Sequence, residues 1–215
     1  MTVAAIVQAR LGSTRLPAKV LLPLPNGNVV LQEVIERCHR IPGVDVVVVA
    51  IPDTPENDIL LPFAVYRTTQ VVRGPEHDVL ARYAKAAEAV NADVVLRITS
   101  DCPLLDPEVC GELLKLRERT AAGYASNSWP ARSYPVGFDC EAVTRGALEM
   151  ADYALAPDAL EREHVGLAWI QKEPVIKKAL LKAMDDRSHI RWTLDTKDDY
   201  VAIWNEFERR QREAA

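Results

Sequence analysis

Three short apolar runs, separated by longer mixed segments, constrain what this chain can fold into. They cover 4–8, 46–51 and 93–99, and each is rich in Val, Ile, Leu or Ala. Continuous apolar strands of this length are typical of parallel sheets that are covered on both faces. Parallel strands need long crossover connections, usually helical, and the segments between the runs are long enough to supply them. The sequence therefore predicts an α/β fold with a mostly parallel sheet.

Helical patterns fill the intervals between these runs. We expect helices over 31–40 and 78–90, and one that starts at Pro107 after Asp106 as its N-cap. A last helix should follow Thr196, because a capping-box pattern there precedes an apolar face of Tyr200, Ile203, Trp204 and Phe207. Further strands are expected over 137–144, 175–183 and 190–194. No linker divides the chain, so we expect a single domain over 1–215.

The turn after the first strand concentrates positive charge. Arg10, Arg15 and Lys19 lie within ten residues of one another. Such a turn exposes backbone N–H groups that the sheet does not use, and these together with the cations suit a polyphosphate. The loop could also be a plain solvated turn. Pro17 stiffens it, however, and the preceding strand places it where α/β proteins bind ligands, so we favour a site. The patterns G-x-x-x-x-G-K-[ST] and G-x-G-x-x-G are absent here.

Two aspartates follow later strand-like runs. Asp101 ends R-I-T-S-D and Asp195 ends I-R-W-T-L-D. We expect both at the edge of the sheet where the basic turn lies. Magnesium prefers one or two carboxylates together with water and substrate phosphates, so the pair predicts a Mg²⁺ site. Alone, Asp195 could equally be a turn acid. Asp106, Asp198 and Asp199 are better explained as acids at helix starts.

A polar and aromatic loop leads from Tyr124 towards a strand that carries Asp139 and Glu141. Alternation along that strand would put both acids on one face. Two carboxylates are costly to bury unpaired, so they bind hydroxyls or cations, or face water. We favour contact with a sugar, and we expect Asn127 to join it. Glu163 and His164 could close the same pocket or simply begin a surface helix.

Composition excludes several classes of function. The chain has a formal net charge of −5 and no basic tract, which argues against nucleic-acid binding and assigns the clustered cations to a small anion. No apolar run approaches the roughly 20 residues that span a bilayer, and no targeting segment is recognisable. We therefore expect a cytoplasmic protein without a membrane partner. The four cysteines show no zinc-binding spacing and should be reduced and mostly buried.

Taken together, these motifs resemble the cytidylyltransferase family. The resemblance spans nearly the whole chain, and it rests on I-V-Q-A-R-L-G-S-T-R-L-P-A-K-V-L, R-I-T-S-D-C-P-L-L-D, F-D-C-E, R-E-H-V and R-W-T-L-D-T-K-D-D-Y. It is closest to the spore-coat polysaccharide biosynthesis branch. The enzymes that make CMP-3-deoxy-manno-octulosonate and CMP-sialic acid are more distant. The likeness implies the Rossmann-like, three-layer fold of nucleotide-diphospho-sugar transferases, with helices on both faces of the sheet.

The resemblance also implies an activity and its residues. The activity is a Mg²⁺-dependent transfer of CMP from CTP to a sugar or sugar acid, with release of pyrophosphate, in polysaccharide biosynthesis. The implied catalytic residues are Arg10, Lys19, Asp101 and Asp195, of which the two aspartates would bind the metal. Nucleotide contacts would come from Ala9, Arg10, Gly12, Ser13, Arg15, Lys19, Arg73 and Ser100, with His77 nearby. Acceptor contacts would come from Asn127, Asp139, Glu141, Glu163 and His164.

Two other functions stay open. A glycosyltransferase of the same general fold would consume a nucleotide-sugar, although the usual D-x-D is replaced by D-C-P at Asp101. A catalytically silent module would bind the nucleotide without turnover. If the acceptor carries a carboxylate, Arg132 is the cation that we expect to face it. Aromatic residues near Trp129 and Tyr134 could serve a homodimer contact or cover the sugar. Ala18 stands where relatives often have glycine.

Overall fold

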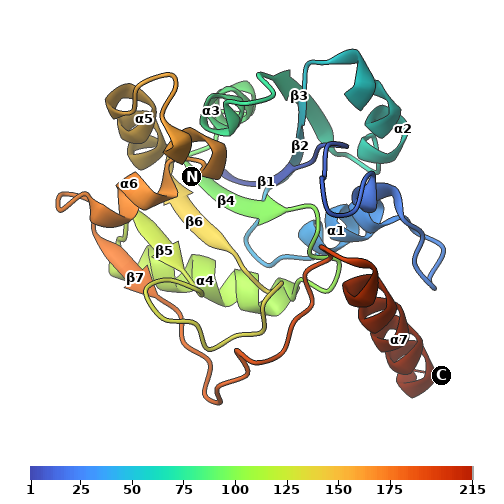
Figure 1. The fold of residues 1–215 in the computed structure, drawn as a ribbon. Helices are drawn as coiled ribbons and strands as arrows, with labels where there is room; N and C mark the ends of the chain where they lie inside the picture. Colours follow the sequence, from blue (N-terminus) through green and yellow to red (C-terminus); the bar gives the residue numbers. More distant parts are fainter. Residues whose placement is uncertain (215) are drawn as a thin grey trace.

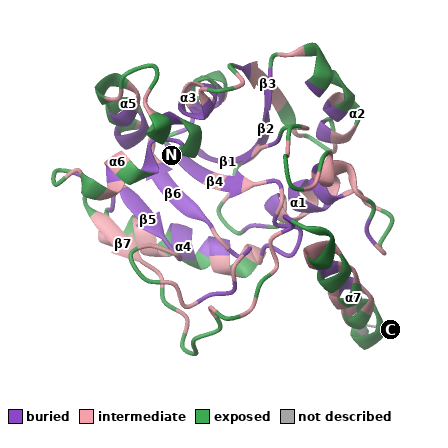
Figure 2. Ribbon diagram, viewed as in Figure 1, coloured by how far each residue is buried: buried purple, intermediate pink, exposed green. Residues whose placement is uncertain are grey.

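The predicted apolar runs form the centre of a seven-stranded sheet with the strand order β3-β2-β1-β4-β6-β5-β7 (Figure 1). The computed structural model describes residues 1–214. Strands β1 (Val3–Gln8), β2 (Val46–Pro52) and β4 (Val94–Thr99) lie side by side and parallel. Figure 2 shows these strands mostly buried, as the continuous apolar runs predicted. At one edge, β3 (Gln70–Gly74) pairs in parallel with β2.

The other half of the sheet is mixed. Strand β6 (Glu141–Thr144) runs antiparallel to β4, and β5 (Tyr124–Ser126) runs antiparallel to β6. The edge strand β7 (Lys178–Leu180) is parallel to β5. Four of the six pairings are therefore parallel, which confirms the predicted class of a mostly parallel α/β sheet.

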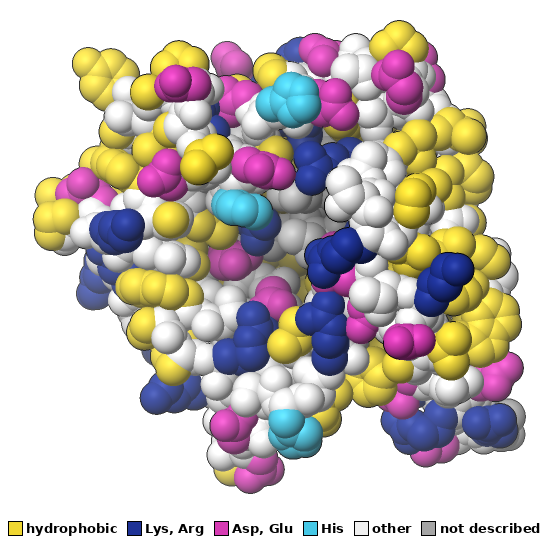
Figure 3. Space-filling view, in the orientation of Figure 1, with side chains coloured by type: hydrophobic (Ala, Val, Ile, Leu, Met, Phe, Trp, Pro, Cys, Tyr) yellow, Lys and Arg dark blue, Asp and Glu magenta, His cyan; other side chains and the backbone are white. Residues whose placement is uncertain are grey.

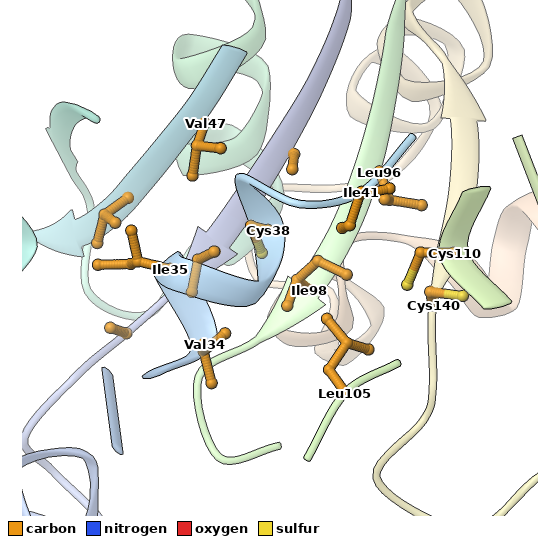
Figure 4. Packing of buried hydrophobic residues seen from close by; sticks show 14 of the residues in the cluster. Val34, Ile35, Cys38, Ile41, Val47, Leu96, Ile98, Leu105, Cys110 and Cys140 are labelled. Carbon is orange, nitrogen blue, oxygen red and sulfur yellow. The ribbon is translucent and has the colours of Figure 1, made fainter. Parts of the chain in front are cut away.

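Helices cover both faces of the sheet. The first face packs against α1 (Val30–Cys38), α2 (Leu61–Ala64) and α4 (Pro107–Thr120), and the second against α3 (Val79–Ala89), α5 (Arg145–Ala154) and α6 (Leu167–Lys172). Figure 4 shows the first of these cores, in which Cys110 and Cys140 point toward one another. All four cysteines are unbridged and buried, as expected. Within residues 1–214, no helix is both long and apolar enough to cross a membrane.

The last helix, α7 (Lys197–Ala214), extends away from the sheet (Figure 1). Its N-terminus has the predicted capping box, because the Asp199 N–H donates to Thr196 Oγ1 at 3.2 Å while Asp199 Oδ2 accepts from the Thr196 N–H at 2.8 Å. Ile203 and Phe207 on its inner face belong to a third apolar cluster with residues of the turns beneath it. The Asp106 cap of α4 is also confirmed, since its carboxylate accepts from the N–H groups of Glu108 and Val109.

Three strand predictions were wrong or too long. Residues 190–194 form no strand, because their contact is a single bridge between Val136 and Arg191. The expected strand over 137–144 begins only at Glu141, and the one over 175–183 covers only Lys178–Leu180. The remaining residues of each segment form no ladder with a neighbouring strand. Strands β3 and β5 and helices α2 and α5 match none of the predicted elements.

Short 3₁₀ turns complete the connections. They are η1 (Lys19–Leu21) after the basic turn, η2 (Pro55–Leu60) after β2, and η3 (Leu160–His164) before α6. Turn η1 lies in the connection after β1, and η2 lies in the connection after β2. Turn η3 packs against α3. These turns carry several of the residues that the sequence singled out, including Lys19 and Glu163.

We predict that α7 makes the protein sensitive to acid through Glu206. Hydrogen bonds from Arg209, together with Arg210, outweigh burial and lower the pKa of Glu206 to about 2. An unfolded glutamate titrates at about pH 4.3, so this stabilisation is present above that pH and is lost as the pH falls towards 2. Melting temperatures of wild type and Glu206→Gln should therefore differ near neutral pH and converge in acid. The exposed Glu118, whose side chain has no ion-pair partner within 1–214, gives the matched control Glu118→Gln. A temperature difference that stays constant with pH would contradict the assignment.

Candidate active site

The candidate site lies where β1 and β4 end. Figure 3 shows a hollow near the middle of this face, surrounded by basic and acidic side chains. Ligands of open α/β sheets bind outside the carboxyl ends of the strands, which is where this hollow lies. The basic turn follows β1 directly, and Ser100 and Asp101 follow β4.

The backbone of the basic turn is pinned at both ends and open in the middle. The Leu11 N–H donates to Asn57 Oδ1 at 2.9 Å, and the Ala18 N–H donates to the Leu11 carbonyl at 3.2 Å. Within the described residues, the N–H groups of 12–15 have no hydrogen-bond partner. Four successive unpaired amides suit an anion.

Ala18 adopts a left-handed conformation with φ 54°. This conformation costs an alanine free energy that a glycine avoids. Ala18 immediately precedes η1, so the left-handed residue turns the chain and directs Lys19 inward. The side chain of Lys19 is only 12% exposed.

Lys19 joins the two predicted metal ligands. Its Nζ donates to Asp101 Oδ2 at 2.7 Å and to Asp195 Oδ1 at 2.9 Å, although the two aspartates are 94 positions apart in the sequence. Burial lowers the pKa of Lys19, but the charges and hydrogen bonds of Asp101 and Asp195 outweigh this effect and raise it above its ordinary value. Lys19 is therefore a cation throughout the physiological range.

Two arginines add to the positive charge around Asp195. Arg15 lies 2.8 Å from Oδ1, and Arg191 donates to Oδ2 at 2.6 Å. Burial raises the pKa of Asp195, but hydrogen bonds from Lys19 and Arg191 and the charge of Arg15 lower it overall. Arg191 also pairs with Asp199 at 3.0 Å, so the capping residue of α7 is tied to the site. Asp195 is a carboxylate surrounded by three cations.

The backbone holds the two aspartates in fixed relation. The Leu194 N–H donates to the Asp101 carbonyl at 2.8 Å, so the residue before Asp195 is bonded to Asp101 itself. Behind Asp101, the buried Cys102 thiol lies 3.2 Å from Thr99 Oγ1 and 3.8 Å from Thr193 Oγ1. These contacts connect the end of β4 to the segment 193–195 without a shared strand.

The donor set at this point fits a magnesium ion. Asp101 and Asp195 offer carboxylate oxygens from two sides of one ammonium group, and Asp101 Oδ1 has only a weak thiol contact at 3.7 Å. Within residues 1–214, no group of three or more His, Cys, Asp and Glu side chains gathers as a metal cage. A cation here would take its other ligands from water and phosphate oxygens, which is the usual coordination of Mg²⁺ in nucleotide sites.

Arg10 lies at a second part of the hollow. Its guanidinium is 3.4 Å from Glu163 Oε1, and both residues line a pocket of about 260 Å³ with His77. The pocket is braced by the buried Arg162, which bonds to Asp78 at 2.7 Å and to Asp152 at 2.6 Å. Two of the predicted residues from distant segments, Arg10 and Glu163, are thus brought together, whereas His164 is exposed and has no side-chain partner within 1–214.

The three predicted acceptor residues from the end of β5 to the start of β6 differ in their surroundings. Asn127 is 1% exposed, donating to the Phe138 carbonyl and accepting from the Cys140 N–H, so its side chain braces the turn that carries Asp139. Asp139 pairs with Arg132. Glu141 is buried and pairs with Arg97 at 3.0 Å. Because β6 starts at Glu141, the expected alternation of the two acids along one strand was wrong.

The remaining predicted residues lie close to the strand ends. Ala9 and Ser100 are buried directly after β1 and β4. Arg73, at the end of β3, donates to the Thr54 carbonyl at 3.0 Å and pairs with Asp58 at 2.5 Å. Its guanidinium therefore supports the connection after β2. Gly12 and Ser13 lie in the open part of the basic turn, where Ser13 Oγ accepts from the Leu16 N–H at 3.4 Å.

The structure adds residues that the sequence analysis did not assign. Arg191, Arg162 and Arg97 each pair with a predicted or capping acid. Arg191 and Arg162 stand inside the motifs R-W-T-L-D and R-E-H-V, so position within a motif was the available signal. Arg97 likewise begins the motif R-I-T-S-D-C-P-L-L-D, but its partner Glu141 becomes apparent only once β6 is placed beside β4.

Comparison with known proteins gives a consistent result. The profile of the family described as Cytidylyltransferase matches residues 4–146. The Spore coat polysaccharide biosynthesis protein SpsF of Bacillus subtilis strain 168 is 31% identical over 204 residues, which cover 92% of this chain and 83% of that protein. The match to the family profile includes the basic turn and Asp101.

Solved structures agree with the sequence match. A cytidylyltransferase from Leptospira borgpetersenii superimposes with a TM-score of 0.87 at 30% identity, covering 95% of this chain and 85% of that one. A CMP:2-keto-3-deoxy-manno-octonic acid synthetase complexed with CTP gives a TM-score of 0.71 at 19% identity, covering 98% and 100%. The second likeness shows the shared fold.

Proposed function

The chain belongs to the cytidylyltransferase family of nucleotidyltransferases, and from this premise we propose that it transfers CMP from CTP to a sugar or sugar acid and releases pyrophosphate. The spore-coat relative supports a role in polysaccharide biosynthesis. The structure of a related synthetase with CTP supports the choice of nucleotide. Since the reaction consumes CTP, we place it in the cytoplasm.

The observation that carries this proposal is the position of Lys19 between Asp101 and Asp195. Every cation of the site already meets a carboxylate: Arg10 meets Glu163, Arg15 and Arg191 meet Asp195, and Lys19 meets both aspartates. The site is therefore close to electrically neutral. Binding of a triphosphate to such a site is favourable when a divalent metal ion pairs with the carboxylates, because the basic side chains can then pair with the phosphates.

The reaction requires negative charge to be stabilised on phosphate oxygens. A sugar hydroxyl attacks the α-phosphorus and releases its proton to water, the bond from that phosphorus to the bridging oxygen of pyrophosphate breaks, and charge builds on the leaving group. Lys19, Arg10 and Arg15 lie on the turn whose amides at 12–15 have no partner within the described residues, so this turn can bind the triphosphate and stabilise pyrophosphate as it leaves. In this mechanism, positioning and electrostatics supply most of the acceleration.

Asp101 and Asp195 are the residues that would hold Mg²⁺, which when bound polarises phosphate oxygens as a Lewis acid. Arg191 and the Leu194 N–H keep Asp195 oriented toward Asp101. For the acceptor, we propose the region of Asp139, Glu141, Glu163 and His164, with Asn127 acting by bracing the backbone. Arg132 is the cation that would meet a carboxylate on the acceptor, in exchange for its present pairing with Asp139.

A pyrophosphate-release screen tests the proposal. The purified protein is incubated with each of the four nucleoside triphosphates and Mg²⁺, against a panel of sugar acids, amino sugars and neutral sugars. We expect release with CTP and at least one acceptor, and a matching CMP-sugar by mass spectrometry. Turnover of a nucleotide-sugar without pyrophosphate release from CTP would favour a glycosyltransferase instead. CTP binding that survives Asp101→Asn and Asp195→Asn, with no turnover, would favour a silent module. Light scattering tests whether the chain also forms a homodimer.

A further inference from the structure

The turn that carries Asp139 touches the segment that carries Asp195 through a glycine. Gly137 has φ +100°, a conformation that side-chain-bearing residues rarely adopt. A Cβ at this position would lie 2.6 Å from the Trp192 carbonyl carbon and 2.9 Å from the Thr193 nitrogen. Both of these are backbone atoms, so no side-chain rotation can relieve the contact. Only glycine allows these two backbone segments to lie this close.

Hydrogen bonds on both sides of this contact join the two segments. The Val136 N–H donates to the Ile190 carbonyl at 2.9 Å, and the Trp192 N–H donates to the Val136 carbonyl at 2.7 Å. The chain then continues to Leu194, whose N–H donates to the Asp101 carbonyl at 2.8 Å. A continuous series of backbone contacts thus runs from the Gly137 turn to both predicted metal ligands.

The same turn also holds the predicted acceptor residue Asp139. The Gly137 N–H donates to Asp139 Oδ2 at 3.1 Å, and Asn127 fixes the backbone at Phe138 and Cys140. Phe138 and Leu194 are buried in one apolar cluster. Asp139 and Asp195 are therefore attached to opposite sides of one backbone contact.

We infer that Gly137 is a positioning residue, whose missing side chain sets the place of Asp195 relative to Asp101 and couples it to the turn of Asp139. This inference rests on the proposed function, because it assigns the two aspartates to the metal. In a strand-paired site, a ladder would fix the register of residues 190–194. Here that segment has a single bridge, so the Gly137 contact takes over that task.

The test compares Gly137→Ala with Gly146→Ala. Gly146 is a suitable control because a Cβ there would meet nothing within 4 Å. We expect Gly137→Ala to fold, with a lower melting temperature, and to bind Mn²⁺ in the absence of nucleotide about tenfold more weakly by electron paramagnetic resonance. Its kcat/KM for CTP should fall about 100-fold, as misplacement by about 1 Å can cause. Gly146→Ala should match wild type in both.

The outcomes separate positioning from stability. A lower melting temperature with wild-type Mn²⁺ affinity would assign Gly137 to stability alone and overturn the inference. Because Mn²⁺ affinity is measured without CTP, it stays informative even if the wild-type protein shows no transfer of CMP. Absence of CMP transfer would contradict the proposed function and not this inference.

Hydrogen exchange of the wild type provides a test that needs no variant to fold. The amides of Val136, Trp192 and Leu194 all belong to the proposed series of contacts. Addition of Mg²⁺ with CTP should slow their exchange together. Slower exchange at Leu194, with Val136 and Trp192 unchanged, would show that the Gly137 turn is not coupled to the aspartates.

Discussion

Asp101→Asn and Asp195→Asn are each expected to lower kcat/KM for CTP by about 10³-fold. A bound metal contributes several kcal/mol of charge stabilisation at a reacting phosphate, and each 1.36 kcal/mol is about tenfold in rate. An amide keeps the size of the carboxylate but removes the charge that attracts Mg²⁺. The rate of pyrophosphate release, measured across Mg²⁺ concentrations, checks this expectation.

Asp106→Asn is the matched control for these two variants. Asp106 caps α4 close to the same strand end, and asparagine is as good an N-cap as aspartate. Its kcat/KM should equal that of wild type. Asp195→Asn should also lower the melting temperature more than Asp101→Asn, because Asp195 meets three cations and Asp101 meets one. Activity of Asp101→Asn or Asp195→Asn within threefold of wild type would contradict the assignment of the metal to these two carboxylates.

Lys19→Met is expected to lower kcat/KM by about 10²–10³-fold, the usual effect of removing a buried group that stabilises charge in a transition state. Methionine fills a similar volume and keeps the site closed. The variant should at the same time bind Mn²⁺ more tightly without nucleotide, because no ammonium group competes for Asp101 and Asp195. Rate measurements and Mn²⁺ titration together check both directions.

The prediction is specific because Lys19→Met should lower kcat/KM and at the same time raise the affinity for Mn²⁺. Lys177→Met is the control, since Lys177 is exposed and its side chain has no partner within the described residues. It should change neither rate nor affinity. Weaker Mn²⁺ binding by Lys19→Met would indicate that Lys19 merely organises the local fold. Unchanged turnover would show that the ammonium group does not act on the phosphates.

The sequence predicted those parts of the fold that depend on local pattern. Buried parallel strands need continuous apolar residues, so β1, β2 and β4 could be predicted from the sequence. The helix caps at Asp106 and Thr196 could be predicted from the residues that follow them. Residues 190–194 were also predicted as a strand but pair through one bridge. Whether an extended segment joins a ladder depends on which neighbour the tertiary fold supplies, and local pattern does not contain that information.

The candidate site shows the same division. The ends of the parallel strands β1 and β4 lie at one edge of the sheet, which brings Lys19 and Asp101 together as predicted. Asp195 also lies there, but it follows no strand, and the Leu194 N–H bond to the Asp101 carbonyl holds it in place. The environment of Glu141 was not predictable, since its partner Arg97 lies 44 positions away on a neighbouring strand. Nor was the role of Asn127, whose two hydrogen bonds go to backbone groups that carry no sequence signal.

The most direct test of the central claim is a crystal structure of the wild-type protein with CTP and Mn²⁺, in which the anomalous signal locates the ion. The account predicts an ion bonded to both Asp101 and Asp195, with the Lys19 ammonium group moved from between them onto a phosphate oxygen. An ion or a triphosphate bound away from these residues, with Lys19 still bridging the two carboxylates, would contradict it.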